Sequence, residues 1–161
     1  MKSISLTPIG IARTPHHRLE EIPIQPVYCR GIAGQIVLEE SYREGLTDLD
    51  GFNYIHLIYL FDHAQPPKML VKPFLDDHVH GVFATRVPHR PNPLGLSLVK
   101  LVAIAGNVLQ VEDIDLLDGT PILDIKPYIA DFDRRDDATA GWRAKLTPEV
   151  IAARARREYR G

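Results

Sequence analysis

Proline and glycine are the residues that most constrain how this chain can fold. Thirteen prolines and eleven glycines are scattered through its 161 residues. Because both residue types interrupt regular structure, they leave little room for long helices. Hydrophobic residues make up 45% of the chain and charged residues 25%, which is typical of a globular protein and excludes general disorder or a coiled coil. We therefore expect a single domain that is built from short segments.

The short segments carry the alternation and the β-branched or aromatic residues of strands. We predict strands at 4–13, 31–39, 52–61, 69–74, 81–87 and 122–128, and a hairpin over 97–115 that turns at Gly106-Asn107. A short helix or turn is expected at 40–49. A short helix is expected at 150–159, after an N-cap at Thr147 and a proline at its first position. The predicted fold class is mainly β: a small antiparallel β-barrel, closed or nearly closed, with short helices and a C-terminal helix.

Charge and cysteine content limit the possible environments and partners. The net charge is −2, so bulk charge cannot drive nucleic-acid binding and a local basic patch would be needed. The arginine-rich segment 154–160 is either such a phosphate-contacting patch or a solvated helix face. The single cysteine, Cys29, excludes an internal disulfide and a cysteine-rich zinc site. Neither a signal-peptide core nor a membrane-length apolar stretch is present in the sequence, so we expect a cytoplasmic protein.

The most unusual segment of the sequence is a loop rich in proline and arginine within residues 81–97. Its three prolines fix the backbone before any ligand arrives, because each proline holds φ near −65°. The loop carries Arg86, His89, Arg90 and Asn92. Two guanidinium groups and an amide on a rigid loop suit recognition of a carboxylate, a phosphate or a purine edge. The alternative is a stiff turn with solvated arginines.

A second segment combines a turn with several carboxylates. Asp118-Gly119-Thr120-Pro121 has the residue types of a turn. The four aspartates at 113, 115, 118 and 124 also suit Ca²⁺ or Mg²⁺, but their spacing differs from that of an EF-hand. His78 and His80 would share one face of a strand, as in some metal sites. A metal-dependent hydrolase is therefore one alternative function.

Together these segments resemble the TsaA-like, or TrmO, family over roughly residues 6–131. The matching stretches are Ile9-Gly10-Ile11-Ala12-Arg13-Thr14-Pro15, Ile24-Gln25-Pro26, residues 81–86, Arg90-Pro91-Asn92-Pro93-Leu94-Gly95-Leu96-Ser97 and residues 118–128. The resemblance implies a β-barrel domain at 5–134 and a C-terminal extension with a short basic helix at 135–161. It implies a homodimer with a site for S-adenosylmethionine near the subunit boundary, and no metal. The implied reaction is methylation of N6 of threonylcarbamoyl-adenosine beside the anticodon of a tRNA substrate.

The resemblance also implies which residues bind the methyl donor. They are Gln25, Pro26 and Val27 in an early loop, Asp62 and His63 after the aromatic strand, Arg86, Arg90 and Leu96 around the rigid loop, and Asp118, Gly119, Thr120 and Pro121 in the later turn. Asp118 can accept hydrogen bonds from ribose hydroxyls or from the ammonium group of the donor. Backbone groups at Gly119 and Thr120 can bind the adenine edge, and Arg86 can pair with the carboxylate of the donor.

His89 and Asn92 are the catalytic candidates. The N6 atom of a carbamoylated adenine is a poor nucleophile, because the carbonyl draws in its lone pair, so a base that removes its proton would help. An imidazole titrates near neutral pH, which makes His89 a candidate base; the alternative is that His89 packs or contacts phosphate. Asn92-Pro93 resembles the Asn-Pro dipeptide of adenine-N6 methyltransferases. A second alternative function is a non-catalytic S-adenosylmethionine-binding barrel that acts as a sensor or partner module.

Overall fold

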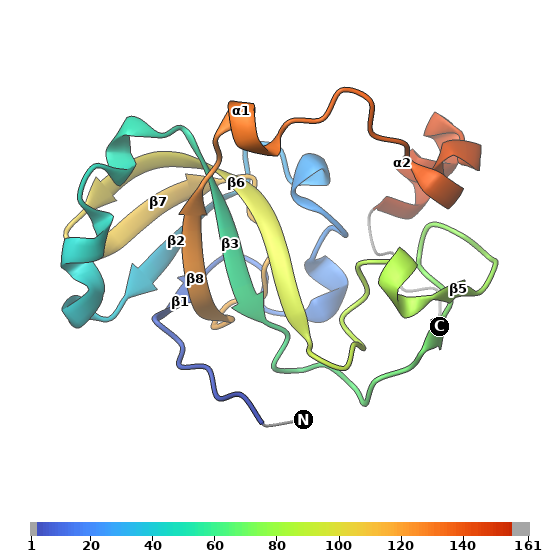
Figure 1. Ribbon diagram of the computed structural model, residues 1–161, viewed down its shortest axis with the longest axis horizontal. Coiled ribbons are helices and arrows are strands. Elements are labelled where there is room, and N and C mark those ends of the chain that lie inside the picture. Colours follow the sequence, from blue (N-terminus) through green and yellow to red (C-terminus); the bar gives the residue numbers. More distant parts are fainter. Residues whose placement is uncertain (1–2, 156–161) are drawn as a thin grey trace.

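The computed structural model, which describes residues 3–155, has a closed six-stranded antiparallel barrel at its centre (Figure 1). The strands follow one another around the barrel in the order β1-β2-β7-β6-β3-β8. The predicted fold class, a mainly β antiparallel barrel, is confirmed. The barrel strands are β1 (Gly10–Arg13), β2 (Ala33–Leu38), β3 (Tyr54–Leu60), β6 (Leu94–Ala105), β7 (Val108–Glu112) and β8 (Pro121–Pro127).

Short helices and a small two-stranded sheet decorate the barrel. The sheet joins β4 (Leu70–Val71) to β5 (His80–Gly81). The α-helices are α1 (Ala130–Asp133) and α2 (Pro148–Ala155), and the 3-10 helices are η1 (Leu19–Glu21), η2 (Pro26–Tyr28), η3 (Glu40–Leu46), η4 (Leu49–Gly51), η5 (Val82–Ala84) and η6 (Gly141–Lys145). Within residues 3–155, no helix has the length and apolar character that crossing a membrane requires.

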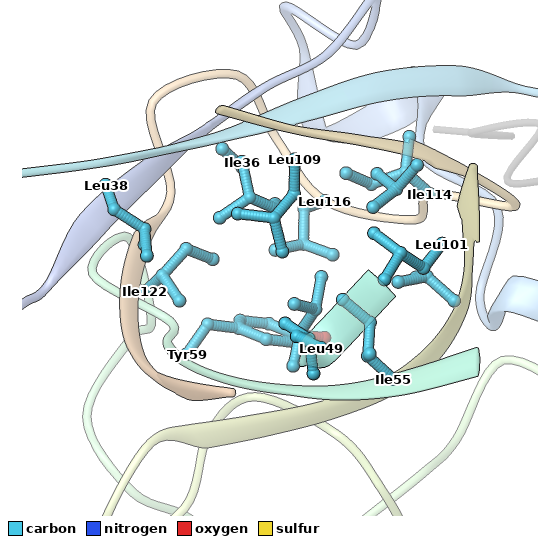
Figure 2. Close-up of a cluster of buried hydrophobic side chains, with 14 of the residues drawn as sticks. Ile36, Leu38, Leu49, Ile55, Tyr59, Leu101, Leu109, Ile114, Leu116 and Ile122 are labelled. Atoms are coloured by element: carbon cyan, nitrogen blue, oxygen red, sulfur yellow. The ribbon is translucent and has the colours of Figure 1, made fainter. Parts of the chain in front are cut away.

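Alternation along the strands fills the barrel with side chains. In β3, Ile55, Leu57 and Tyr59 are buried while the residues between them are partly exposed. Figure 2 shows inward-pointing side chains that include Ile36 and Ile122, from strands on different sides of the barrel. In a barrel with so few strands, the inward-pointing side chains fill the interior and leave no channel. Function must therefore lie outside the barrel interior.

The barrel interior also holds a chain of polar groups. The Tyr59 hydroxyl lies 3.0 Å from Ser97 Oγ, which donates a hydrogen bond to Asp115 Oδ1 at 2.6 Å. All three side chains are buried. Buried polar groups cost free energy unless they find partners, so this chain fixes the relative position of β3, β6 and the segment that follows β7.

The structure corrects three of the strand predictions. The strand predicted at 81–87 is wrong for most of its length, because β5 ends at Gly81 and η5 follows. Thr85 causes the change, since both its amide and its hydroxyl donate to the Val82 carbonyl and close a turn there. The strand predicted at 4–13 shrinks to β1, and the strand predicted at 69–74 shrinks to the two residues of β4. The hairpin at Gly106-Asn107 is confirmed with both ends shifted by three residues, and the strands over 31–39, 52–61 and 122–128 are confirmed with ends shifted by one to two residues.

The segment after α1 returns to the loops beside the barrel (Figure 1). The Ile24 amide donates to the Ala155 carbonyl at 3.3 Å, and Arg154 forms an ion pair with Asp77 at 2.7 Å. The expected helix start is confirmed, because the Val150 amide donates to Thr147 Oγ1. Residues 156–159 of the predicted helix, with Arg156 and Arg157, lie outside the described part of the chain, as does Arg160.

Candidate functional site

Arginine and proline shape the predicted rigid loop into a fixed platform. Arg90 Nη1 donates to the Val82 carbonyl at 3.1 Å and to the Thr85 carbonyl at 2.8 Å. Its guanidinium carbon also lies 5.9 Å from the centre of the Phe83 ring. Arg90 thus holds the proline-rich loop against η5. This is a structural role, which differs from the donor-binding role predicted for Arg90. Residues 82–90 consequently behave as one packed unit.

One hydrogen bond joins two of the predicted donor-binding stretches. Arg86 Nη1 donates to Gln25 Oε1 at 2.9 Å, across 61 positions of sequence. Pro26 follows as the first residue of η2, and Val27 within η2 is 59% exposed. Behind this turn, the buried Cys29 thiol donates to the Gln25 carbonyl at 3.5 Å. Burial, and secondarily the carboxylates of Asp115 and Asp113, raise the pKa of the Cys29 thiol to about 12, so it stays protonated.

A cavity of about 430 Å³ opens beside this hydrogen bond, and we call it the Arg86 cavity. That volume is within the range of small-molecule sites, roughly 300–1,000 Å³. Four separate stretches of the chain form its walls. They contribute Ile24 and Gln25, then Pro73, Phe74 and Leu75, then Phe83, Ala84, Thr85, Arg86, Val87 and Pro88, and finally Trp142 and Arg143.

The candidates Asp62 and His63 lie beside the end of the rigid loop. The Phe61 amide, just before them, donates to the Pro93 carbonyl at 2.7 Å. Asp62 Oδ2 and His63 Nε2 are 3.9 Å apart, and both side chains are accessible to solvent. Leu96, on β6, is 47% exposed on the outer face of the barrel. These residues therefore belong to, or directly follow, the paired strands β3 and β6.

The two catalytic candidates lie on the same loop but differ in their contacts. His89 Nδ1 accepts a hydrogen bond from the Gln65 amide at 3.1 Å, and the His89 carbonyl accepts from the Lys68 amide at 3.2 Å. A neutral imidazole whose Nδ1 accepts a backbone N–H carries its proton on Nε2. Asn92 is exposed, and its carbonyl accepts a hydrogen bond from the Leu94 amide at 2.7 Å.

The Asp118 turn is held against the first barrel strand. Asp118 Oδ1 accepts a hydrogen bond from the Thr14 amide at 3.0 Å, and Oδ2 lies 3.6 Å from the Arg13 guanidinium. Gly119 has φ +85° and donates its amide to the Ala12 carbonyl at 2.8 Å, while the Thr120 amide donates to Leu117. Both amides are thus used within the chain, and the Thr120 carbonyl accepts a hydrogen bond from the Ala12 amide at 2.9 Å, so the predicted adenine-binding role of these backbone groups is not available from Gly119 N, Thr120 N or Thr120 O.

The predicted residues therefore form two groups in a single chain. Gln25 and Arg86 meet at the Arg86 cavity, whereas Asp62, His63 and Leu96 do not line it and belong to or follow the paired strands β3 and β6. Pro121, by contrast, pairs with Ile11 on β1, and the Asp118 turn does not line the cavity. The two groups share one end of the barrel, because Tyr59 pairs with Gly95 on one side and with Ile122 on the other.

Of the residues that line the cavity, the sequence predictions assigned only Gln25 and Arg86 to the site, and Trp142 and Arg143 are among those that they missed. The available signal was the only tryptophan of the chain, placed after a glycine in a polar stretch. His78 and His80, which the sequence offered as metal ligands, both contact one carboxylate instead. Asp76 Oδ1 lies 2.9 Å from His78 Nδ1, and Asp76 Oδ2 lies 2.9 Å from His80 Nε2. In the part of the chain described, no three His, Cys, Asp or Glu side chains are grouped as metal ligands would be.

A closed six-stranded barrel beside an arginine-bearing loop, with a cavity whose described lining holds no carboxylate, defines a small β-barrel protein, distinct from the doubly wound nucleotide-binding folds. A model of the tRNA-methyltransferase O N-terminal domain matches residues 11–134. The chain belongs to this family, which confirms the resemblance drawn from its motifs.

Relatives and solved structures agree with this family. A probable S-adenosyl-L-methionine-binding protein of Pyrococcus abyssi is 44% identical over 151 residues, which cover 94% of this chain and 82% of the relative. The mouse tRNA (adenine(37)-N6)-methyltransferase is 34% identical over 78% of this chain, but this match spans 31% of the mouse protein. The crystal structure of TrmO from Pseudomonas aeruginosa superposes with a TM-score of 0.78 at 36% identity, and covers 91% of this chain and 66% of that one.

Proposed function

We propose that this protein is an S-adenosylmethionine-dependent methyltransferase that methylates N6 of threonylcarbamoyl-adenosine next to the anticodon of tRNA. Family membership and the names of the relatives support methyl transfer to tRNA. The observation that carries the proposal is the hydrogen bond from Arg86 to Gln25, which joins two predicted donor-binding stretches at the wall of a cavity of suitable size.

The chain's own residues supply binding and alignment in this proposal. A sulfonium methyl group already has a good leaving group, so the enzyme chiefly holds the nucleophile in line with it. Arg86 offers its remaining donors to a carboxylate, and Gln25 holds the guanidinium in place. Asp62, His63 and Leu96 complete the proposed donor contacts, together with Pro26, Val27 and Arg90.

We further propose that the donor binds where two chains meet. Asp118 and its turn lie apart from the Arg86 cavity within one chain, although both belong to the predicted donor site. A second copy would bring its Asp118 turn to the first copy's cavity. Exposed apolar side chains on the outer face, among them Val27 and Leu96, would be covered by such a contact. Analytical ultracentrifugation that finds only monomers in the presence of donor would contradict this arrangement.

The contacts of His89 favour a positioning role over that of a base. Its Nδ1 already accepts the Gln65 amide, so a neutral ring has no lone pair left to take a proton from N6. We propose that His89 holds the 65–68 segment in place, and that the exposed Asn92 contacts the acceptor adenine. If His89→Ala keeps the full methylation rate at saturating donor, His89 is not the base; a loss of more than about a hundredfold in rate, within the range of general-base catalysis, would restore that role.

The decisive experiment combines the full chain, labelled S-adenosylmethionine and threonylcarbamoylated tRNA, followed by mass analysis of the nucleosides. We expect a methyl group on N6 of the modified adenosine. Arg86→Ala should lower the methylation rate at limiting donor, whereas Arg43→Ala, an exposed arginine paired with Glu40 on η3, should not. Donor binding without transfer to any tRNA would instead favour the second candidate, a non-catalytic sensor or partner module, which the naming of the archaeal relatives as binding proteins supports.

A further inference from the structure

The segment that follows the barrel supplies one wall of the Arg86 cavity. Trp142 and Arg143 belong to η6, which lies beyond the stretch matched by the family model, residues 11–134. Gly141 starts this turn with φ +56° and sends the following two side chains back toward η5 and η2. The cavity is thus a joint product of the barrel loops and the C-terminal segment.

The Trp142 ring is held in a fixed orientation. Its Nε1 donates a hydrogen bond to the Ala84 carbonyl at 2.8 Å. One face stacks on the His80 ring, with the centroids 4.5 Å apart and the planes 22° apart. His80 is itself anchored by Asp76 at 2.9 Å. An indole that is fixed at one edge and on one face, and that lines a cavity, is a preorganised surface for stacking a planar ring.

The charge of the Arg86 cavity is entirely positive. Its described lining holds two charged residues, Arg86 and Arg143, and no carboxylate. Arg143 Nη2 donates to the Tyr28 hydroxyl at 3.3 Å, a neutral partner, and Arg86 likewise bonds to the neutral Gln25 amide. No ion pair is found for either guanidinium among residues 3–155, so both charges remain to attract an anionic group.

We propose that Trp142 and Arg143 bind the ligand of this cavity, an adenine nucleoside that carries an acidic group. Trp142 would stack on the purine, and Arg143 would bind the carboxylate or phosphate. This inference rests on the proposed function and adds two residues to its site. Two ligands share the required chemistry: the methyl donor, whose adenosine carries an amino-acid carboxylate, and the acceptor nucleotide, whose adenine carries a threonine carboxylate.

The protein contains its own reporter for this test, because Trp142 is its only tryptophan. The full chain is titrated with S-adenosylhomocysteine, with N6-threonylcarbamoyladenosine 5′-monophosphate and with adenosine, and both tryptophan emission and heat are recorded. We expect at least one of the two acidic ligands to quench the emission. Adenosine, which lacks the acidic group, should bind at least about tenfold more weakly, in keeping with the loss of a charge-assisted hydrogen bond. The ligand that quenches identifies which of the two sources occupies the cavity.

Variants separate a binding role from a structural one. Arg143→Ala should weaken binding of the quenching ligand about tenfold or more, and Arg143→Lys should recover part of the lost affinity. Lys145→Ala, an exposed change in the same turn outside the cavity lining, should leave affinity unchanged. Trp142→Phe, measured by heat, should retain more affinity than Trp142→Leu. Affinities are compared only among variants whose Tm equals that of the unmodified protein.

The outcomes distinguish this inference from the proposed function. Calorimetric binding of either ligand with unchanged emission and with wild-type affinity in Arg143→Ala would overturn the role of this wall while leaving the methyltransferase proposal intact. Absence of binding by both readouts would overturn it as well. Quenching that depends on Arg143, in a protein that methylates no tRNA, would support the inference and refute the enzymatic proposal.

Discussion

Gly95 leaves room for the Tyr59 ring to pack against β6, and its replacement by alanine tests this packing directly. Gly95 pairs with Tyr59 across β6 and β3. A Cβ at position 95 would overlap three carbons of the Tyr59 ring, the farthest of them, Cδ2, at 2.7 Å. Because the ring is 5% exposed and its hydroxyl lies 3.0 Å from Ser97 Oγ, it has little room to move. The added methyl group must therefore strain the core or displace the ring.

The expected destabilisation follows from two effects. Overpacking a core costs about 1–3 kcal/mol, and loss of the Tyr59–Ser97 hydrogen bond adds about 1 kcal/mol. Gly95→Ala should therefore lower the free energy of unfolding by about 2–4 kcal/mol. For a chain of this size, 1 kcal/mol lowers Tm by roughly 2–4 °C, so we expect a decrease of roughly 4–16 °C. Urea and thermal unfolding followed by circular dichroism measure both quantities.

A matched control and a second-site change make the test specific. Gly45→Ala places a Cβ where nothing lies within 4 Å, and should be neutral or slightly stabilising. In a Tyr59→Leu background the ring is gone, so adding Gly95→Ala should cost less than about 1 kcal/mol. An unchanged Tm for Gly95→Ala, or an equal cost in both backgrounds, would refute the ring overlap as the cause.

Three further predictions concern the thiol, the Asp118 turn and the acid side of the pH range. Burial raises the pKa of Cys29 to about 12, so a disulfide reagent at pH 8 should leave the folded protein unmodified and react fully in urea. Gly119→Ala should destabilise by about 1–2 kcal/mol in urea unfolding, because φ is +85° there, and equal stability would refute that strain. Hydrogen bonds from two histidine rings lower the pKa of Asp76, so their stabilisation is complete above the ordinary carboxyl pKa of about 3.9 and is lost as the pH falls below it. The urea midpoint of unfolding should therefore begin to decrease as the pH falls below about 4, and Asp76→Asn should show a smaller decrease.

Local sequence patterns were enough to predict the barrel strands but not the short elements around them. The residue pattern of a buried strand predicts the strand over 52–61, and a turn-forming pair predicts the hairpin at Gly106-Asn107. Both signals act over a few residues. Residues 81–87 look equally apolar, yet local hydrogen bonds from Thr85 and Arg90 close a turn there. Side-chain hydrogen bonds to the backbone overrode strand propensity at this point.

The residues of the candidate site likewise include some that the sequence predicted and some that it could not predict. Motif resemblance placed Gln25 and Arg86 in one site, and the structure brings them within hydrogen-bond distance. Trp142 and Arg143 reach the same cavity through contacts with Ala84 and Tyr28, which lie 58 and 115 positions away in the sequence. No local periodicity encodes such distant contacts, so sequence reasoning could not assign these two residues to the site.

The return of the C-terminal segment has a consequence for how the protein is made. Three walls of the Arg86 cavity are encoded before residue 89, but the fourth comes from residues 142 and 143. During synthesis the barrel strands, which end at Pro127, can all leave the ribosome before that wall emerges. A nascent chain would therefore complete its barrel while its ligand cavity still lacks one side, and would gain full affinity only at a late stage of translation.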